Sequence, residues 1–536
     1  MIMNTLKLMI KLTVFLLIVS GHYLSSQKWI PDLGNGSYKN PIIWADYSDP
    51  DVIRFGEEFY MTASSFNCVP ALPLLRSTDL VNWEIINYAV KRFPDSYFDR
   101  VQHGNGVWAP AIRFHDGWFY IFWGDPDRGI FMVRTEDPYG DWSAPVLVKK
   151  AFGNIDPCPL WDDDGKVYLV HAFANSRAGV NNILQVQELI EHGTVAGNNR
   201  MVVYNGSPNH NTMEGPKFYK RNGYYYIFTP AGGVAEGYQM VLRSRNPFGP
   251  YEEKTVLAQG NTNINGPHQG GWVELENGEN WFIHFQERQP YGRIVHLEPL
   301  KWIDDWPVIG DDTDGDGTGE PVLEFRKPEV NKPSIIKIPQ TSDEFNYTNL
   351  SLAWQWHANY YPHWYSLTAN QGYLRLYPQY NPDAHSIWMV PNLLLQKLPA
   401  PEFTVTTKMD VSNLRERERA GIVVMGLDYA TLTLTPVEEG FKMELATCRN
   451  AHTGNDESIK YTNNPGVSEL FLRVRFNNDG KCQFAYSENG TDFQDVGELF
   501  QAREGRWIGA KVGVFAVSAR ETGLKGFADF DWFRVE

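Results

Sequence analysis

Ser48-Asp49-Pro50-Asp51-Val52-Ile53 is the stretch on which our interpretation of the fold rests, because it opens the first of five copies of one pattern. Each copy begins with a polar or otherwise distinctive residue, usually followed by proline. It continues as an apolar strand, a turn with glycine and an aromatic-rich return strand. The copies start at Asp49, Trp108, Asp156, Glu214 and His268. Repetition at this interval indicates one structural unit used five times.

The turns within the copies predict hairpins. Glycine stands alone in the first copy, and Asp or Asn precedes it in the other four: Gly56, Asp116-Gly117, Asp164-Gly165, Asn222-Gly223 and Asn277-Gly278. Such dipeptides favour two-residue turns in which both central residues take a positive φ. We expect the return strands at residues 58–62, 118–123, 166–171, 224–228 and 280–285. This arrangement predicts the four-stranded blades of a five-bladed β-propeller.

The five starting residues are predicted to meet. The first strand of each propeller blade lines the central channel, so equivalent positions at the start of these strands face one end of the axis. Three carboxylates, a tryptophan and a histidine would converge there. An Asp beside Pro often only initiates a turn, and we assign such a capping role to Asp51, Asp163 and Asp164. For the three leading carboxylates, the shared register favours a functional site.

The chain beyond the repeats predicts a second domain. Strands that alternate apolar and polar residues are expected at 367–376, 403–411, 422–427, 470–476 and 511–517. This pattern is typical of an antiparallel β-sandwich, so we expect a propeller at residues 27–325 and a sandwich at 341–536. The acidic, glycine-rich run 311–320 partly resembles a calcium loop, but without flanking helices it is better interpreted as a solvated linker. Trp354 and Trp356 fit a core, a pocket rim or a carbohydrate contact.

Residues 1–26 have the features of an export signal. Lys7 and Lys11 precede an apolar run that covers residues 12–19, and small residues follow it. The run is too short to span a bilayer, and no cysteine for a lipid anchor comes after it. We therefore expect an exported protein that does not associate with the membrane once the signal is removed. The periplasm is the first expectation for its location, and the extracellular space is the alternative.

Composition narrows the class of partner. The 536 residues carry a net charge of −16, which argues against nucleic acid and anionic membranes. Aromatic residues make up 14% of the chain and suit both β cores and stacking on sugars. A disulfide between Cys448 and Cys482 is conceivable, but four buried thiols, with Cys68 and Cys158, are the simpler interpretation. The oligomeric state is left open.

Five short motifs give the chain a family resemblance. They are Ser48-Asp49-Pro50-Asp51, Val107-Trp108-Ala109-Pro110, Ile155-Asp156-Pro157, Glu214-Gly215-Pro216 and Tyr291-Gly292-Arg293. Each motif is weak alone, but in this order and register they resemble glycoside hydrolase family 43. That family comprises five-bladed propeller enzymes that include β-xylosidases and α-L-arabinofuranosidases. The C-terminal part resembles the concanavalin-like sandwich attached to propellers of this family.

The resemblance implies a role for each residue of the site. Asp49 is expected to be the general base that activates water, Glu214 the general acid, and Asp156 the residue that raises the pKa of Glu214 and holds it in place. The family inverts configuration, so Asp49 and Glu214 should stand far enough apart to admit a water molecule. Phe66 and Trp108 are expected to line the subsite for the terminal sugar, and Arg293 is expected to contact that sugar or Asp156.

No cofactor is required by this chemistry, and a structural calcium ion is the metal considered. His268 matches a family histidine near the propeller axis that often helps to hold a central ion or water, although a core histidine is an equal alternative. Asp343 and Asp529 are candidates for a calcium site of the kind that some relatives carry between their chain ends.

These features predict an exo-acting, inverting enzyme whose partner is an oligosaccharide. Two further motif-like stretches, residues 214–219 and 266–270, resemble exo-acting enzymes of polysaccharide-degrading bacteria. We expect release of terminal α-L-arabinofuranosyl residues from hemicellulose-derived oligosaccharides, with β-D-xylosidase or dual activity as the close alternative. A propeller that binds carbohydrate without catalysis is the alternative of another class.

Overall fold

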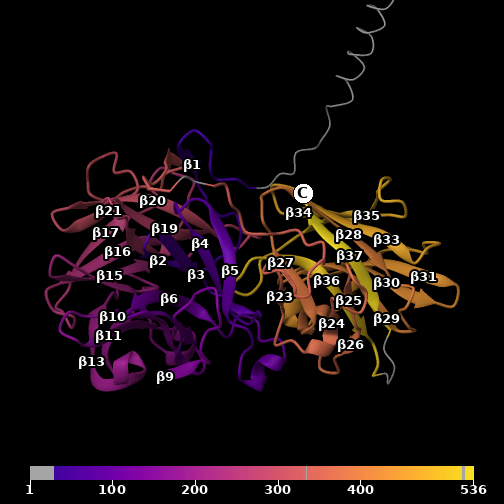
Figure 1. Ribbon diagram of the computed structural model, residues 1–536, viewed down its shortest axis with the longest axis horizontal. Coiled ribbons are helices and arrows are strands. Elements are labelled where there is room, and N and C mark those ends of the chain that lie inside the picture. Colours follow the sequence, from indigo (N-terminus) through magenta and orange to yellow (C-terminus); the bar gives the residue numbers. More distant parts are fainter. Residues whose placement is uncertain (1–28, 333–334, 522–525) are drawn as a thin grey trace, which may run out of the picture.

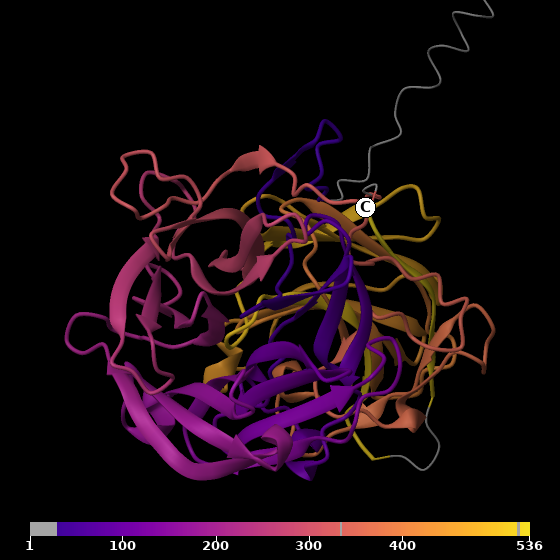
Figure 2. The ribbon, with the colours of Figure 1, turned by 60° about the vertical axis from the view of Figure 1, so that its left-hand side comes forward.

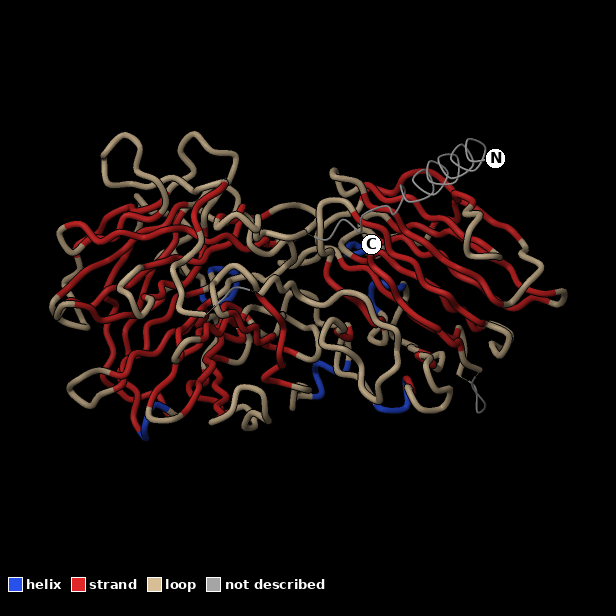
Figure 3. Tube along the Cα trace, turned by 45° about the horizontal axis from the view of Figure 1, so that its top comes forward, coloured by secondary structure: helices blue, strands red, loops and turns tan. Residues whose placement is uncertain are grey.

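The computed structural model describes residues 29–332, 335–521 and 526–536. They form two domains side by side, a propeller and a sandwich (Figure 1). Strands dominate both domains, and helices are confined to short segments (Figure 3). The predicted signal at residues 1–26 lies outside the described residues. Within those residues, no helix has the length and apolar character needed to cross a membrane.

The propeller consists of five four-stranded antiparallel sheets, as the repeat predicts, and Figure 2 brings this domain forward. The blades are β2 (Asp51–Phe55), β3 (Glu58–Thr62), β4 (Ala71–Ser77) and β5 (Trp83–Val90); β6 (Trp108–His115), β7 (Trp118–Asp125), β8 (Gly129–Thr135) and β9 (Val146–Lys150); β10 (Asn154–Trp161), β11 (Val167–Phe173), β12 (Ile183–Ile190) and β13 (Val195–Asn205); β14 (Lys217–Arg221), β15 (Tyr224–Ala231), β16 (Tyr238–Ser244) and β17 (Glu252–Leu257); and β18 (His268–Glu274), β19 (Asn280–Glu287), β20 (Arg293–Ile303) and β21 (Trp306–Ile309). Each blade takes its strands consecutively from the chain.

The ring closes where the last blade meets the first. A Cβ added to Gly271 in β18 would lie 3.0 Å from the backbone nitrogen of Val52 in β2, so only glycine allows this approach. A small sheet of β1 (Ser37–Lys39) and β22 (Glu324–Arg326) joins the two ends of the propeller segment. Asp51 is fully buried and pairs with Arg113 at 2.6 Å, while it also accepts the N–H of Ile112. The predicted capping role of Asp51 is therefore wrong, because this carboxylate ties the first blade to the second.

The predicted turns are hairpins of two kinds. Asp116-Gly117 and Asn222-Gly223 take a positive φ at both residues, as expected for two-residue turns. In the third and fifth blades, only the glycines Gly165 and Gly278 do so. These two turns are longer, since residues 162–166 and 275–279 separate their strands, and each contains one left-handed glycine.

The sandwich consists of two antiparallel sheets, apart from one parallel pair. One sheet has the order β23 (Gln355–Trp356), β27 (Leu393–Lys397), β36 (Lys511–Ser518), β29 (Glu418–Met425), β30 (Tyr429–Val437), β31 (Gly440–Cys448) and β32 (Ser458–Asn463), and β26 (Gln379–Tyr380) pairs parallel with β36. The other has β24 (Tyr365–Ser366), β25 (Leu374–Leu376), β37 (Ala528–Val535), β28 (Phe403–Asp410), β33 (Glu469–Phe476), β34 (Lys481–Ser487) and β35 (Gln494–Gln501). Their inner faces share one large apolar core.

Short helices lie in the connections of both domains: η1 (Ser96–Asp99), α2 (Asn175–Ala178), η2 (Glu191–Gly193), η3 (Pro362–Trp364), η4 (Ile387–Met389) and η5 (Ala451–Thr453). The four cysteines are buried free thiols, as predicted. The acidic run 311–320 forms a largely exposed loop whose ends pair at Asp311 and Glu320, in agreement with a solvated segment.

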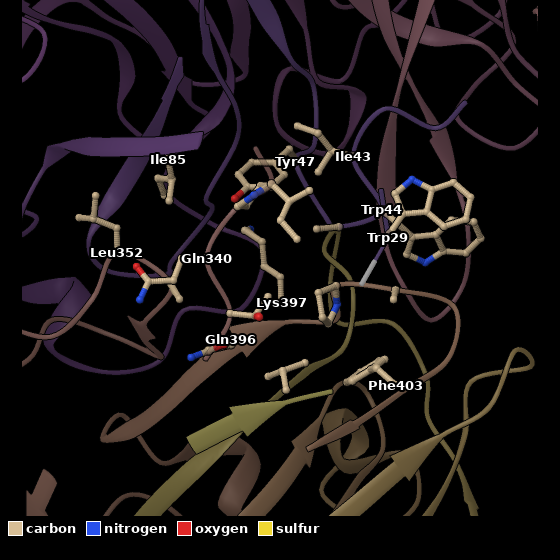
Figure 4. A pocket seen from close by; sticks show the side chains of 18 of the residues that line it. Trp29, Ile43, Trp44, Tyr47, Ile85, Gln340, Leu352, Gln396, Lys397 and Phe403 are labelled. Carbon is tan, nitrogen blue, oxygen red and sulfur yellow. The ribbon is translucent and has the colours of Figure 1, made fainter. Parts of the chain in front are cut away.

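The seam between the domains is mostly apolar. Trp354 and Trp356 are buried in the core of the sandwich, and the backbone N–H of Trp356 donates to the carbonyl of Val69 in the propeller. A cavity of about 50 Å³ lies at this seam, between Tyr47 of the propeller and Lys397 of the sandwich (Figure 4). The continuous packing fixes one domain against the other, which matters because both domains reach the pocket described next.

Candidate active site

The six residues predicted for catalysis and sugar binding line one pocket of about 300 Å³. They are Asp49, Phe66, Trp108, Asp156, Glu214 and Arg293. They come from all five blades, and four of them, Asp49, Trp108, Asp156 and Glu214, lie at or near the start of an innermost strand. The repeat predicted that Asp49, Trp108, Asp156 and Glu214 would converge, and these four residues line one pocket. Phe66 and Arg293 were expected there from the family resemblance.

A ring of left-handed residues shows which positions of the blades are equivalent. One residue in each blade takes a positive φ just before or within the innermost strand: Asp49, Ala109, Asp156, Gly215 and Gln269. The predicted register treated Trp108, Glu214 and His268 as equivalent to the two aspartates, and it was wrong by one residue in these three blades. The proline that follows Asp49, Ala109, Asp156 and Gly215 marks the correct alignment. Glu214 thus reaches the pocket from one position before the ring.

Asp49 is held on both carboxylate oxygens. Arg293 donates from Nη1 to Oδ1 at 2.8 Å, and the hydroxyl of Ser64 donates to Oδ2 at 2.6 Å. Ser64 itself accepts the N–H of Ala109 at 2.8 Å, which directs its hydrogen towards Asp49. Each oxygen keeps a second lone pair, so the carboxylate can still accept a bond from a water molecule in the pocket.

Asp156 lies at the buried end of the pocket. It is 2% exposed, and its Oδ2 accepts the N–H of Gly215 at 2.7 Å and the Nε2 of Gln269 at 3.2 Å. Burial raises the pKa of Asp156, and the neighbouring Asp49 carboxylate raises it further, whereas the bond from Gly215 lowers it. Asp156 is thus a carboxyl group with a fixed orientation, directly beside the residue that follows Glu214.

Glu214 differs from the two aspartates because its carboxyl group accepts no hydrogen bond from the described residues. Its side chain remains 28% exposed and faces His268 at 3.7 Å. Burial raises the pKa of Glu214, Asp156 raises it further, and Arg293 lowers it. A carboxyl group without donors and beside another acid favours its protonated form, which is the form that can donate a proton.

Arg293 connects the carboxylates to the frame of the fifth blade. It is 7% exposed, its backbone N–H donates to Asp46 at 2.9 Å, and its guanidinium stacks 4.9 Å from the centre of the Phe285 ring. This guanidinium forms an ion pair with Asp49 at 2.8 Å. It can therefore balance part of the negative charge that three converging carboxyl groups create.

Aromatic rings from both domains form the wall of the pocket. Trp108 is fixed by a bond from Nε1 to the carbonyl of Gly104 at 2.7 Å, and Trp507 of the sandwich meets it edge-on at 6.2 Å. Trp507 lies in the loop between β35 and β36. A Cβ on Gly104 would lie 2.9 Å from the Trp507 ring, so the propeller backbone supports this loop closely. Phe66 completes the lining.

A second pocket of about 310 Å³ adjoins the first. Arg293 and Trp507 line both pockets, and Glu287, Glu504 and Arg506 line the second one alone. The second pocket is thus shared between the domains. It offers space and polar groups next to the carboxylates for whatever continues beyond a sugar in the first pocket.

The family profile of "Glycosyl hydrolases family 43" matches residues 38–307, and that of the "Beta xylosidase C-terminal Concanavalin A-like domain" matches residues 342–536. The chain belongs to glycoside hydrolase family 43. It is therefore a glycoside hydrolase, and its substrate is a carbohydrate. The propeller with three converging carboxyl groups and the attached sandwich are the two parts of such a family 43 enzyme.

Comparison with individual proteins agrees with this assignment. A candidate beta-xylosidase of Xylanibacter ruminicola is 37% identical over 90% of this chain and 86% of its own length. A non-reducing end alpha-L-arabinofuranosidase of Bacteroides ovatus is 29% identical over 97% of each chain. The crystal structure of a family 43 protein from Bacillus licheniformis superposes with a TM-score of 0.80 at 28% identity and covers 93% of this chain and 99% of that one.

Three residues of this family 43 site were not found by sequence reasoning. Ser64 and Gln269 hold Asp49 and Asp156, and Trp507 comes from the other domain. Gln269 lacked the proline that marks the equivalent position in the other four blades, since Gly270 follows it. Ser64 and Trp507 had no signal in the sequence, because a serine after a strand and an aromatic residue in a sandwich loop are common in any β protein.

The residues predicted to bind metal lie apart from one another. His268 is fully buried behind Glu214, neither ring nitrogen has a hydrogen-bond partner among the described residues, and burial lowers its pKa to about 3. Asp343 accepts from Trp354 and from backbone N–H groups, and Asp529 forms a two-bond pair with Arg375. In the described part of the chain, none of the three belongs to a group of three metal-ligating side chains. The geometry thus gives the two aspartates structural partners within the protein.

Proposed function

We propose that this hydrolase removes single terminal β-D-xylosyl residues from xylan-derived oligosaccharides with inversion of configuration. The observation that carries the proposal is the pocket itself. Asp49, Asp156 and Glu214 line one space of about 300 Å³, and the ring of Trp507 lines it as well. A pocket walled on one side by a second domain suits the end of a chain rather than its middle. Release of terminal α-L-arabinofuranosyl residues is the second candidate.

Asp49 is the general base in this proposal. Its carboxylate is fixed by Arg293 and Ser64, and a remaining lone pair can accept a proton from a water molecule as that water attacks the anomeric carbon. Arg293 keeps a positive charge beside Asp49 throughout the reaction, so the base keeps its orientation while its charge changes.

Glu214 is the general acid. Its raised pKa keeps the proton on the carboxyl group near neutral pH, where an ordinary glutamate would have lost it. The proton passes to the glycosidic oxygen as the bond to the leaving sugar breaks. Asp156 supports this role through its charge and through its bond to Gly215, the residue that follows the acid.

The leaving oligosaccharide is assigned to the second pocket. Arg293 and Trp507 border both spaces, so a sugar in the first pocket has its linkage near Glu214 and its neighbour near Glu504 and Arg506. Neutral sugars need hydrogen-bond donors and acceptors rather than a field of one sign. Two residues of opposite charge at this rim meet that requirement.

The choice of xylose over arabinofuranose rests on the relatives. The relative named as a candidate beta-xylosidase is 37% identical to this chain, whereas the named arabinofuranosidase is 29% identical. The higher identity to the named xylosidase favours a β-D-xyloside as the first substrate, in place of the arabinofuranoside expected from short motifs. The named activities of the two relatives place both sugars among the substrates to be tested.

The test compares hydrolysis of an aryl β-D-xylopyranoside, an aryl α-L-arabinofuranoside and unmodified xylobiose by the purified chain. We expect the xyloside and xylobiose to be cleaved at the higher kcat/KM. Proton NMR of the first turnover should show α-xylose released from the β-linked substrate. Release of β-xylose would contradict inversion, and a preference for the arabinofuranoside would reverse the order of the two sugars. Sugar binding without hydrolysis would favour the non-catalytic propeller.

We also propose that the enzyme is exported and acts on oligosaccharides in the periplasm. The support is the charged and then apolar pattern of residues 1–26. Expression of the full chain in a Gram-negative host, followed by fractionation and N-terminal sequencing, tests this proposal. A mature protein that starts near Gln27 in the periplasmic fraction is the expected result, and an uncleaved cytoplasmic chain would contradict it.

A further inference from the structure

A second group of buried titratable side chains lies in the fifth blade, apart from the pocket carboxylates. His284 belongs to β19, and His296 and Glu298 belong to β20. The register pairs His284 with His296 and Phe282 with Glu298, so the three polar side chains lie on one face of the blade. They are at most 1% exposed, and their potential ligand atoms all lie within 4.8 Å of one another.

The surroundings of this group make unpaired polar atoms costly. Phe282 on the same face packs into an apolar cluster with Tyr226 and Phe228 of the fourth blade. A buried polar atom without a partner costs roughly 1–3 kcal/mol. An arrangement that gives more of these nitrogens and oxygens a partner is therefore favoured in the folded protein.

The ring of His284 is oriented with one nitrogen towards the centre of the group. Its Nδ1 lies 3.1 Å from the carbonyl oxygen of Phe285, which can only accept, so Nδ1 carries a hydrogen. Its Nε2 then faces Oε1 of Glu298 at 3.1 Å. A nitrogen lone pair opposite a carboxylate is unfavourable unless a proton or a metal ion lies between them.

The surroundings of His296 decide whether a proton or a metal ion better explains the contact between His284 and Glu298. Both of its ring nitrogens lack a hydrogen-bond partner among the described residues, although the residue is 1% exposed. A proton on His284 would satisfy His284 and Glu298 but would leave His296 unpaired. One metal ion at the centre satisfies a nitrogen of each histidine and an oxygen of Glu298 together.

Outer contacts hold Glu298 ready for such an ion. Its Oε2 accepts the N–H of Val322 at 2.8 Å, and Asn40 donates to Oε1 at 3.3 Å. Ligands of a bound metal are characteristically oriented by hydrogen bonds of this kind, as His284 is by the carbonyl of Phe285. The site is thus arranged beyond its three ligands.

We propose that His284, His296 and Glu298 bind one zinc ion inside the fifth blade. Two imidazole nitrogens and one carboxylate form a donor set that zinc accepts, with a fourth position left for water. The ion joins β19 to β20 beside β18, the strand that carries Gln269 of the pocket. Its role is structural, because the group does not line the sugar pocket.

The test measures metal content rather than activity, so it is independent of the proposed substrate. The full chain, without a histidine tag, is expressed with added zinc and dialysed, and zinc per chain is measured by inductively coupled plasma mass spectrometry. The variants are Glu298→Gln and His296→Phe. His171→Phe is the matched control, since His171 is an equally buried strand histidine of another blade. Circular dichroism confirms that each variant is folded.

We expect about one zinc ion per parent chain and per His171→Phe chain, and at least about a ten-fold lower content in both variants of the group. The zinc X-ray absorption spectrum of the parent should show nitrogen and oxygen ligands. A parent chain with less than about a tenth of an equivalent would overturn the proposal. So would zinc retained in both variants, since the ion would then lie elsewhere, for example in the loop of Asp312, Asp314 and Asp316.

Discussion

The propeller and the sandwich both contribute to the sugar pocket, but they hold their residues by different means. Asp49 and Asp156 stand at left-handed positions of the innermost strands, buried and fixed by two hydrogen-bond donors each. Trp507 stands in a loop between β35 and β36, is 48% exposed, and meets Trp108 only by a ring edge. We infer that the reacting groups are built into the rigid frame, whereas the fit to the substrate is left to a loop.

The positive φ angles at the starts of the innermost strands also have a conformational free-energy cost. A positive φ in a residue other than glycine is unfavourable by roughly 1–2 kcal/mol. Asp49, Ala109, Asp156 and Gln269 all take such a conformation at the pocket, and Phe66 on its wall does so too. Strain of this kind gathers at functional sites, where the surrounding structure fixes a side chain in a useful direction. The sheet ladders of the propeller supply that constraint here.

The largest expected effect on activity comes from a residue of the rigid propeller frame. Glu214→Gln removes the transferable proton while it preserves the shape of the side chain. We expect kcat on xylobiose to fall about 10²–10⁴-fold. Steady-state kinetics on xylobiose and on an aryl xyloside with an acidic leaving group measure the effect. The acidic aryl leaving group needs less protonation, so kcat on the aryl xyloside should fall less than kcat on xylobiose. An equal fall in kcat on both substrates would argue against the acid role of Glu214.

The next prediction concerns the pH dependence of the same acid. Activity requires protonated Glu214 and is lost as the pH rises through its pKa. Burial is the first cause of the raised pKa and the charge of Asp156 the second. Asp156→Asn should therefore move the basic limb of the kcat/KM profile to lower pH, without returning it fully to that of an ordinary glutamate. An unmoved or upward-shifted basic limb would contradict this role of Asp156.

Ser64→Ala tests how firmly the frame must hold the base. A hydrogen bond to a charged group contributes about 1.5–3 kcal/mol, so we expect kcat to fall roughly 10–100-fold with little change in KM. Ser77→Ala is the matched control, since Ser77 is also buried and bonded to an aspartate but lies outside the pocket. If both variants lose the same activity, the loss reflects stability rather than the orientation of Asp49.

On the loop side, Trp507→Ala should raise KM for the sugar about ten-fold and change kcat less, because the ring contributes contact area rather than chemistry. Gly104→Ala should act in the same direction, since its new Cβ would press on the loop at 2.9 Å from Trp507 and its φ of +77° disfavours alanine. Steady-state kinetics of both variants give the two parameters. A large fall in kcat for Trp507→Ala would remove the distinction between frame and loop.

The smallest expected effect is on stability. The raised pKa of Asp156 means that ionising this buried group opposes folding, so its cost is absent at low pH, grows as the pH rises above the ordinary pKa of an aspartate and is complete once the pH exceeds the folded-state pKa. Asp156→Asn should thus raise Tm by roughly 1–2 °C at neutral pH and by less at pH 4. Differential scanning calorimetry at both pH values measures the difference. A Tm that falls at neutral pH would show that the bond to Gln269 outweighs the charge.

The sequence by itself determined the five blades, the all-β class, the second domain and the six residues that meet in the pocket. For Asp49, Trp108, Asp156 and Glu214 this was possible because a repeat converts distant positions into neighbours: these residues are far apart in the chain but stand at or near the start of matching strands. Phe66 and Arg293 followed from the family resemblance of the motifs. Local chemistry, such as glycine in a tight turn or proline after the ring residue, leaves a trace in the sequence.

Only the tertiary structure decided what depends on packing between parts of the chain without a shared repeat. It corrected the register by one residue at Glu214, paired Asp51 with the next blade, and brought Trp507 to the pocket from the other domain. It also placed His284, His296 and Glu298 around one point. Such contacts are set by the relative positions of sheets and loops in space, which follow from the burial of the whole apolar core and not from any local pattern.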